Sequence, residues 1–217
     1  ANEIVATNFA GEVLAWHADG TAVSGFPVGV DPRWSRDDPA AQDRYNRTKP
    51  HFYAQPAVGD LDGDDVPEIV AAAGDRHVYA WHANGNPVAG FPVQLVDPAK
   101  VEAIDPATGK VTFKADSGVA DGGEIIAAPV IGDVDGDGSA DIVVGAQEEY
   151  VEPINLGVPE GGAGADVLGL LASASTLGNT RLYALSGAGE LLDGWPAKLG
   201  MVALEVLPTI GGGIATS

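Results

Sequence analysis

The chain has 217 residues, of which 45% are hydrophobic, and a formal net charge of −20 at pH 7. This composition allows one large domain or two small ones with a real core, and the negative charge argues against a nucleic-acid partner, because phosphate binding needs a basic surface. Thirty glycines, fifteen prolines and no cysteine predict a fold rich in turns and without disulfides. No apolar run has the length needed to span a membrane.

The sequence repeats itself, and the repeats decide the expected fold. EVLAWHADGTAVSGFPV at 12–28 aligns without a gap with HVYAWHANGNPVAGFPV at 77–93, an offset of 65 residues. RLYALSGAGELLDGWPA at 181–197 is a third copy. Upstream of the second and third copies, residues 55–72 match residues 128–145, so a complete unit extends over both segments.

Each complete unit is expected to form four short antiparallel strands, because its apolar runs are bounded by Gly, Asp and Pro. In chain order, the units occupy residues 1–30 (which begin at a second strand), 52–96 and 124–200, and residues 204–217, with LPTIGGG, begin one more. The turns HADG, HANG and SGAG join third and fourth strands. Such units are typical of β-propeller blades, so we expect an all-β fold in which residues 1–217 form one partial propeller of about three blades.

Aromatic residues recur with the units and are expected to pack between blades rather than to hold a ligand. Trp16 and Trp81 fall on third strands, and Phe26, Phe91 and Trp195 fall on fourth strands. About three blades do not easily close a ring, since propellers have roughly four to eight. With Ala1 as its first residue and Met201 as its one methionine, the chain is expected to be a processed product or fragment of a larger propeller, or to complete the ring by self-assembly.

Two loops place carboxylates at positions 1, 3, 5 and 9, directly before an apolar run. Such crowding is costly without a cation, and calcium takes six to eight oxygen ligands in flexible geometry. Position 7 would contribute a backbone carbonyl, and glycines let the loop wrap closely around the ion. The expected ligands of two calcium sites are Asp60, Asp62, Asp64, Val66 and Glu68, and Asp133, Asp135, Asp137, Ser139 and Asp141.

An EF-hand is rejected for these loops, because position 12 is Ala71 or Val144 and both flanks are strand-like. Metal-free turns are the simpler alternative, but four carboxylates in register in two copies favour calcium. Magnesium is disfavoured because it demands stricter geometry. In the first loop Asp65 replaces the second glycine, and Asp tolerates a left-handed conformation better than most residues.

The order of strand, GDxDGDxxxE/D loop, strand and final GFP or GWP resembles the FG-GAP repeat family, the calcium-loop blades of integrin α-subunit propellers and of many secreted bacterial proteins. The resemblance covers nearly all of the chain apart from three insertions. It implies that each loop links the first two strands of a blade and that calcium stiffens the turn. Gly212 stands where a third loop would have its first Asp, so no third site is expected.

The insertions, residues 31–51, 96–123 and 148–180, are where specificity is expected, because loops on a rigid scaffold carry function. The first is either a solvated loop or a surface for acidic sugars or a protein, and it holds Arg33, Trp34, Arg36, Arg44, Tyr45, Arg47 and Lys49. In the second, VEAIDPATGKVTF predicts a β-hairpin. In the third, ADVLGLLASAS predicts a short helix or a buried apolar segment.

The leading interpretation is a calcium-stabilised, secreted or cell-surface propeller that binds a protein or glycan through these insertions. The alternatives are the propeller domain of a lyase-like, polysaccharide-acting enzyme and a structural module of a surface assembly. An enzyme would need an acid or base cluster at the centre of the ring. His51 with Arg44 and Tyr53 is the one unusual cluster in the sequence, so binding is favoured over catalysis.

Overall fold

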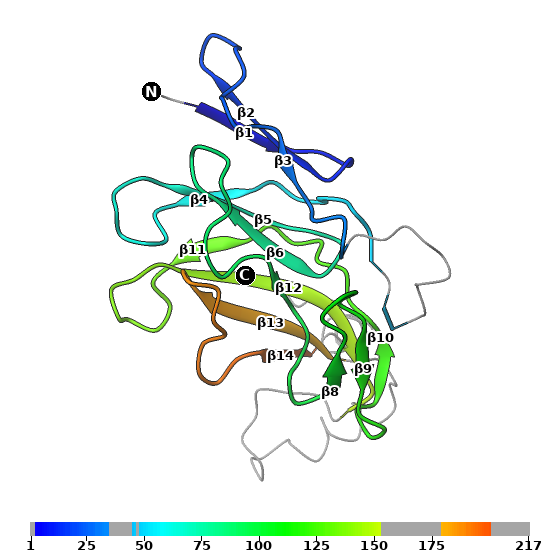
Figure 1. Cartoon of the computed structure of the whole chain (residues 1–217). Helices are drawn as coiled ribbons and strands as arrows, with labels where there is room; N and C mark the ends of the chain where they lie inside the picture. The colour runs from blue at the N-terminus through cyan, green and yellow to red at the C-terminus, as the bar shows by residue number, and fades with distance from the viewer. Residues whose placement is uncertain (1–2, 35–44, 47, 153–178, 201–217) are drawn as a thin grey trace, which may run out of the picture.

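The computed structural model describes residues 3–34, 45–46, 48–152 and 179–200, and these form antiparallel β-sheets with no helix among them (Figure 1). The strands are β1 (Glu3–Thr7), β2 (Glu12–His17), β3 (Val28–Gly29), β4 (Ala57–Gly59), β5 (Glu68–Ala72), β6 (His77–Trp81), β7 (Val93–Gln94), β8 (Val101–Ile104), β9 (Val111–Phe113), β10 (Val119–Asp121), β11 (Val130–Gly132), β12 (Asp141–Tyr150), β13 (Asn179–Ser186) and β14 (Ala197–Gly200). The all-β expectation is therefore confirmed for these residues.

Three sheets correspond to the three predicted units. The first has the order β1-β2-β3 and the second the order β4-β5-β6-β7, so the strands lie side by side in the order of the chain. The third repeats this order in β11-β12-β13-β14, and β10 pairs with the far end of the long strand β12. The start of a further unit at residues 204–217 and the segment ADVLGLLASAS lie outside the described residues.

The second sheet is the middle layer of a three-sheet stack (Figure 1). Successive side chains of a strand point to opposite faces, and every residue of β5 and β6 is buried. On one face, Val70 and Val78 share a core with Ile142 of the third sheet. On the other face, Ile69 packs with Val13 of the first sheet. Two apolar faces explain why these strands are almost continuously hydrophobic.

The outer faces of the stack carry apolar residues that the described residues do not cover. Ile4 in β1 is 60% exposed, whereas Ile69, its counterpart in the second sheet, is 5% exposed. At the other end, Leu199 is 43% exposed, whereas its counterpart Leu95 is 3% exposed. The same repeat positions are thus buried where a neighbouring sheet is present and open where none is described.

The aromatic residues of the GFP and GWP segments lie before the fourth strand rather than on it, so their predicted placement was wrong. The strands β3, β7 and β14 begin one residue after the proline in each case. The reason is that proline has no N–H to donate to the strand ladder. Phe26 and Phe91 nevertheless pack against the cores between the sheets, as the expected inter-blade packing requires.

The glycine of each GFP segment meets a turn of the next sheet. A Cβ on Gly25 would lie 2.0 Å from the carbonyl oxygen of Asn84, and one on Gly90 would lie 2.1 Å from that of Ala188. Gly194 holds the same place in the third sheet, with φ +87°, but no described atom lies within 4 Å of its Cβ position. Glycine at these positions therefore permits both the backbone conformation and the close approach of the next sheet.

Gly90→Ala should lower the free energy of unfolding by about 1–3 kcal/mol more than Gly194→Ala. Both variants place alanine at a positive φ, which is +92° at Gly90 and +87° at Gly194, and both are destabilised by that strain. Only Gly90→Ala also forces a side chain against a neighbouring backbone. Urea denaturation of the two variants measures the difference. Equal losses would contradict the close packing of the second and third sheets.

The second insertion forms the predicted hairpin, with β8 paired to β9. It is tied to the third sheet by a buried ionic cluster. The guanidinium of Arg181, fully buried in β13, donates from Nε to Asp97 Oδ2 at 2.8 Å and lies 2.6 Å, at Nη2, from Glu152 Oε1. Its centre is 4.6 Å from the ring of Tyr150. These contacts join Asp97, near the start of the second insertion, and Glu152, near the start of the third, to a buried side chain of the third sheet.

In the part of the chain that the structure describes, no helix has the length and apolarity needed to cross a membrane.

Candidate metal loops

The two acidic loops connect the first and second strands of complete four-stranded units. Residues 60–67 join β4 to β5, and residues 133–140 join β11 to β12. Both loops therefore lie at the same end of the strands in two neighbouring sheets, as Figure 1 shows for the β4–β5 and β11–β12 connections. This position agrees with the one that the resemblance implied.

In the first loop, the side chain of Asp60 organises the turn. Its Oδ1 accepts a hydrogen bond from the N–H of Gly63 at 2.8 Å, and its Oδ2 accepts one from the N–H of Asp65 at 3.0 Å. Further along, the N–H of Val66 donates to Asp64 Oδ1 at 2.7 Å. Asp65 has φ +66°, so the expected left-handed conformation at this position is confirmed. The backbone thus bends around the carboxylates.

The second loop repeats these contacts residue by residue. Asp133 accepts hydrogen bonds from the N–H groups of Gly136 at 2.7 Å and Gly138 at 3.1 Å. The N–H of Ser139 donates to Asp137 Oδ1 at 2.6 Å. Two segments with different sequences therefore fold into one loop geometry, which indicates that the spacing of the carboxylates determines the turn.

The last carboxylate of each loop reaches back from the second strand. The N–H of Leu61 donates to Glu68 Oε2 at 2.9 Å, and in the second loop the N–H of Val134 donates to Asp141 Oδ2 at 2.9 Å. Glu68 and Asp141 are buried, at 0% and 2% exposed. The carboxylate at position 9 is thus held by a backbone N–H of its own loop and is buried, whereas the carboxylates at positions 1, 3 and 5 lie closer to the solvent.

Most of the predicted ligands are brought together. Oxygen atoms within 4.8 Å of one another come from Asp60, Asp62 and Asp64 in the first loop, and from Asp133, Asp135 and Asp141 in the second. Val66 and Ser139 lie at the expected turn position through their N–H groups, and their carbonyls stay predicted ligands. Asp137 holds the turn through its contact with Ser139.

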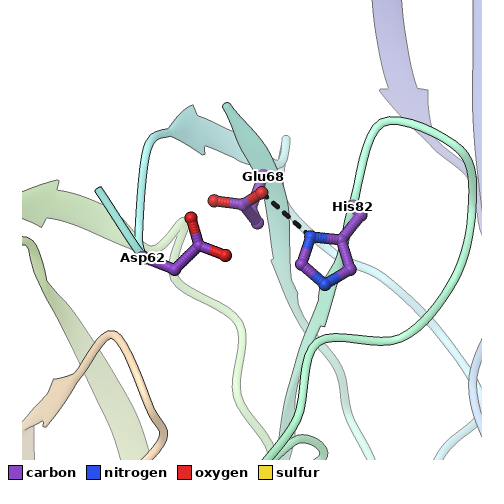
Figure 2. A group of neighbouring side chains, drawn as sticks. All are labelled: Asp62, Glu68 and His82. Carbon is purple, nitrogen blue, oxygen red and sulfur yellow. Dashed lines mark hydrogen bonds and ion pairs between the residues drawn. The ribbon is translucent and has the colours of Figure 1, made fainter. Parts of the chain in front are cut away.

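His82 is a neighbour of the first loop that the predicted ligand set does not include. Its Nδ1 lies 3.1 Å from Glu68 Oε1, and Asp62, Glu68 and His82 bring one atom each within 4.8 Å of one another (Figure 2). The first sheet repeats the pair, with His17 Nδ1 3.5 Å from Glu3 Oε1. The sequence carried a signal for this contact, because Glu3 and His17 recur at the repeat offset as Glu68 and His82. In each unit the two residues stand opposite each other on neighbouring antiparallel strands.

The electrostatics of the first loop favour an ionised carboxylate at position 1. Burial raises the pKa of Asp60, but the N–H groups of Gly63, Asp65 and Asp64 outweigh it and hold the pKa below its usual value. Each loop presents a set of hard carboxylate oxygen atoms in a turn that backbone donors already shape. This donor set fits calcium, which prefers carboxylate and carbonyl oxygens. The imidazole of His82, through its contact with Oε1, can orient the carboxylate of Glu68.

The other unusual group from the sequence, around His51, has an aromatic environment. The ring centroid of His51 lies 5.4 Å from that of Phe9 and 5.9 Å from that of Tyr53. Its Nδ1 is 2.5 Å from the carbonyl oxygen of Phe9. Arg44, the third residue of the predicted cluster, lies outside the described residues.

Comparison with known families supports the assignment of the loops. Residues 127–165 match the family model of the FG-GAP repeat, and this segment contains the whole second loop. A comparison with curated proteins gave no match. The first loop lies outside the matched segment but shares its geometry with the second. The chain therefore contains an FG-GAP repeat at residues 127–165, as the sequence resemblance predicted.

Proposed function

We propose that the chain is part of a calcium-stabilised β-propeller, of the integrin α-subunit type, that acts outside the cell as a binding or adhesion module for a protein or glycan. The observation that carries this proposal is the repetition of one acidic loop at the same place in two stacked sheets. The FG-GAP repeat supports the propeller, because repeats of this family form propeller blades. The stacking of the second sheet between two others supports the same architecture.

In this proposal Asp60, Asp62, Asp64, Val66 and Glu68 hold one calcium ion, and Asp133, Asp135, Asp137, Ser139 and Asp141 hold a second. Calcium neutralises carboxylates that otherwise repel one another. It would thereby fix the connection between the first two strands of each blade. Sites of this kind in extracellular modules bind calcium with Kd values on the order of 10⁻⁴–10⁻³ M, which suits a secreted or cell-surface protein.

The open outer faces of the stack, at Ile4 and Leu199, would pack against further blades. Those blades come either from a longer chain or from another copy that completes the ring. Both faces repeat positions that are buried between the described sheets, so the expected partner surface is another blade of the same kind. The insertions at the rim would carry the ligand surface.

Binding of the protein to an array of acidic and neutral glycans, in calcium and in EDTA, tests the functional part of the proposal. We expect binding in calcium that is lost in EDTA and reduced in an Asp62→Asn, Asp135→Asn double variant. An Asp193→Asn variant, which removes an exposed carboxylate outside both the loops and the insertions, should bind like the unmodified protein. Absence of binding to any glycan in calcium would contradict a glycan ligand, and binding unaffected by EDTA would contradict a role for calcium in it.

A further inference from the structure

A small cavity lies where the first insertion, the β5–β6 turn and the β8–β9 hairpin meet. Its volume is about 170 Å³, which is several times the ~30 Å³ that one water molecule occupies in the liquid. Trp34, Asn46, Arg76, Gln94 and Lys110 are among the residues that line it. The cavity is thus built in part by two of the three insertions in which we expect specificity, and it lies apart from the two acidic loops.

Two of the residues that line this cavity, Arg76 and Trp34, each carry a buried hydrogen-bond donor that has no acceptor among the described residues. Arg76 is 2% exposed, and it donates from Nε to the carbonyl oxygen of Gly123 at 3.1 Å and from Nη2 to that of Tyr45 at 2.6 Å. Its Nη1 is buried without a partner, and so is Nε1 of Trp34. Buried donors are nearly always paired in proteins, so these two indicate an acceptor supplied from outside the chain.

The backbone at Arg76 supports a role for its side chain. Arg76 has φ +71°, in the left-handed region that disfavours residues with a side chain. The corresponding position of the first unit is Gly11, with φ +79°. The second unit therefore has an arginine at a position where the turn itself calls for glycine. Strained backbone of this kind is found mainly at functional sites.

The walls of the cavity are fixed before any ligand arrives. Asn46 pairs in both directions with the backbone of Val111, at 3.2 Å and 2.7 Å. Gln94 donates from Nε2 to the carbonyl oxygen of Gly109 at 2.6 Å. The ring of Trp34 is stacked on that of His77, with centroids 5.4 Å apart. A site that is already ordered loses little entropy on binding.

We propose that this cavity binds a small carboxylate, whose oxygens accept the hydrogen bonds that Arg76 Nη1 and Trp34 Nε1 leave unmade. The charged residues of the lining are Arg76, Lys110 and Asp105, so positive charge exceeds negative charge here in a chain whose net charge is −20. The volume limits the occupant to a single acidic sugar or a smaller acid. The inference rests on the proposed binding function and names the chemistry that one subsite would recognise.

Calorimetric titration of the whole chain in calcium with glucuronate, acetate and glucose tests the proposal. Glucuronate should bind and glucose, which lacks the carboxylate, should not. Arg76→Gly, which installs the residue of the first unit, should weaken Kd by roughly tenfold or more, because an unmade hydrogen bond to a charged group costs that much. Trp34→Phe, which keeps an aromatic ring over His77, should weaken it by a smaller factor. Lys114→Gln, on the same hairpin but away from the cavity, should leave it unchanged.

Acetate that binds as tightly as glucuronate would support recognition of the acid group alone, and tighter glucuronate would support a sugar acid. Unchanged affinity in both Arg76→Gly and Trp34→Phe would overturn the proposal, as would absence of binding by either acid. Affinity that persists in Arg76→Gly but vanishes in EDTA would place the ligand at the acidic loops and overturn it too. If Arg76→Gly does not give a cooperative melt, Trp34→Phe decides. Glycan binding on the array that is unaffected by these variants would leave the proposed module intact while removing this subsite from it.

Discussion

Calcium at about a hundred times its Kd is expected to raise the melting temperature of the metal-free protein by roughly 5–10 °C for each filled loop. Binding to the folded state alone at that concentration contributes about 2.7 kcal/mol, and each kcal/mol shifts the melting temperature of a protein of about this size by roughly 2–4 °C. The physical reason is the repulsion within each loop, where three carboxylate oxygens lie within 4.8 Å of one another. Differential scanning calorimetry in EDTA and in calcium measures the shift.

Loop variants separate the two sites. Asp62→Asn and Asp135→Asn each remove one carboxylate from a cluster and should each abolish about half of the calcium-dependent shift, whereas Asp116→Asn should preserve all of it. In EDTA the loop variants should melt no lower than the unmodified chain, because they relieve repulsion. A melting temperature that does not respond to calcium in the unmodified protein would contradict the metal assignment.

Arg181→Ala is expected to lower the free energy of unfolding by roughly 3–5 kcal/mol. The guanidinium is fully buried between Asp97 and Glu152, so its removal leaves two carboxylates without their buried partner. Arg33→Ala is the matched control, because its ion pair with Asp31 is solvent-exposed and should contribute about 0–1 kcal/mol. Urea denaturation compares the two, and equal losses would show that the buried cluster does not stabilise the fold.

The ionic cluster around Arg181 should also make the free energy of unfolding fall at acidic pH. Burial raises the pKa of Glu152, but hydrogen bonds from Lys100 and Arg181 outweigh it and bring the pKa to about 2, from an ordinary value of 4.5. A depressed pKa contributes stability above the unfolded value, and that stability is lost as the pH falls from 4.5 towards 2. Arg181→Ala should therefore flatten the decline of stability over this range.

The repeat alignment predicted much of the fold because local signals recur in register. Short apolar runs gave the strands of the second and third sheets, and the carboxylate spacing located both loops, including the left-handed residue Asp65. The start of each fourth strand was predicted too early, because the effect of the proline on the ladder outweighs the apolar pattern around it. The hairpin in the second insertion had its own turn signal and was predicted correctly.

The buried cluster could not be predicted, because its partners are distant in the chain. Arg181 and Asp97 are 84 positions apart, and neither residue differs in type from an exposed charge. The pairing of Glu68 with His82 depends on the cross-strand register, which a reading of each segment by itself misses. The unusual position of Arg76 could be predicted in part. The repeat alignment shows an arginine where the first unit has Gly11, but only the structure shows that one of its nitrogens has no partner.

Isothermal titration calorimetry of the metal-free chain with calcium tests the central claim most directly. We expect two ions bound per chain, one ion in Asp62→Asn and one in Asp135→Asn, with two retained in Asp116→Asn. A stoichiometry of zero in the unmodified protein, or binding that both loop variants leave at two ions, would contradict it.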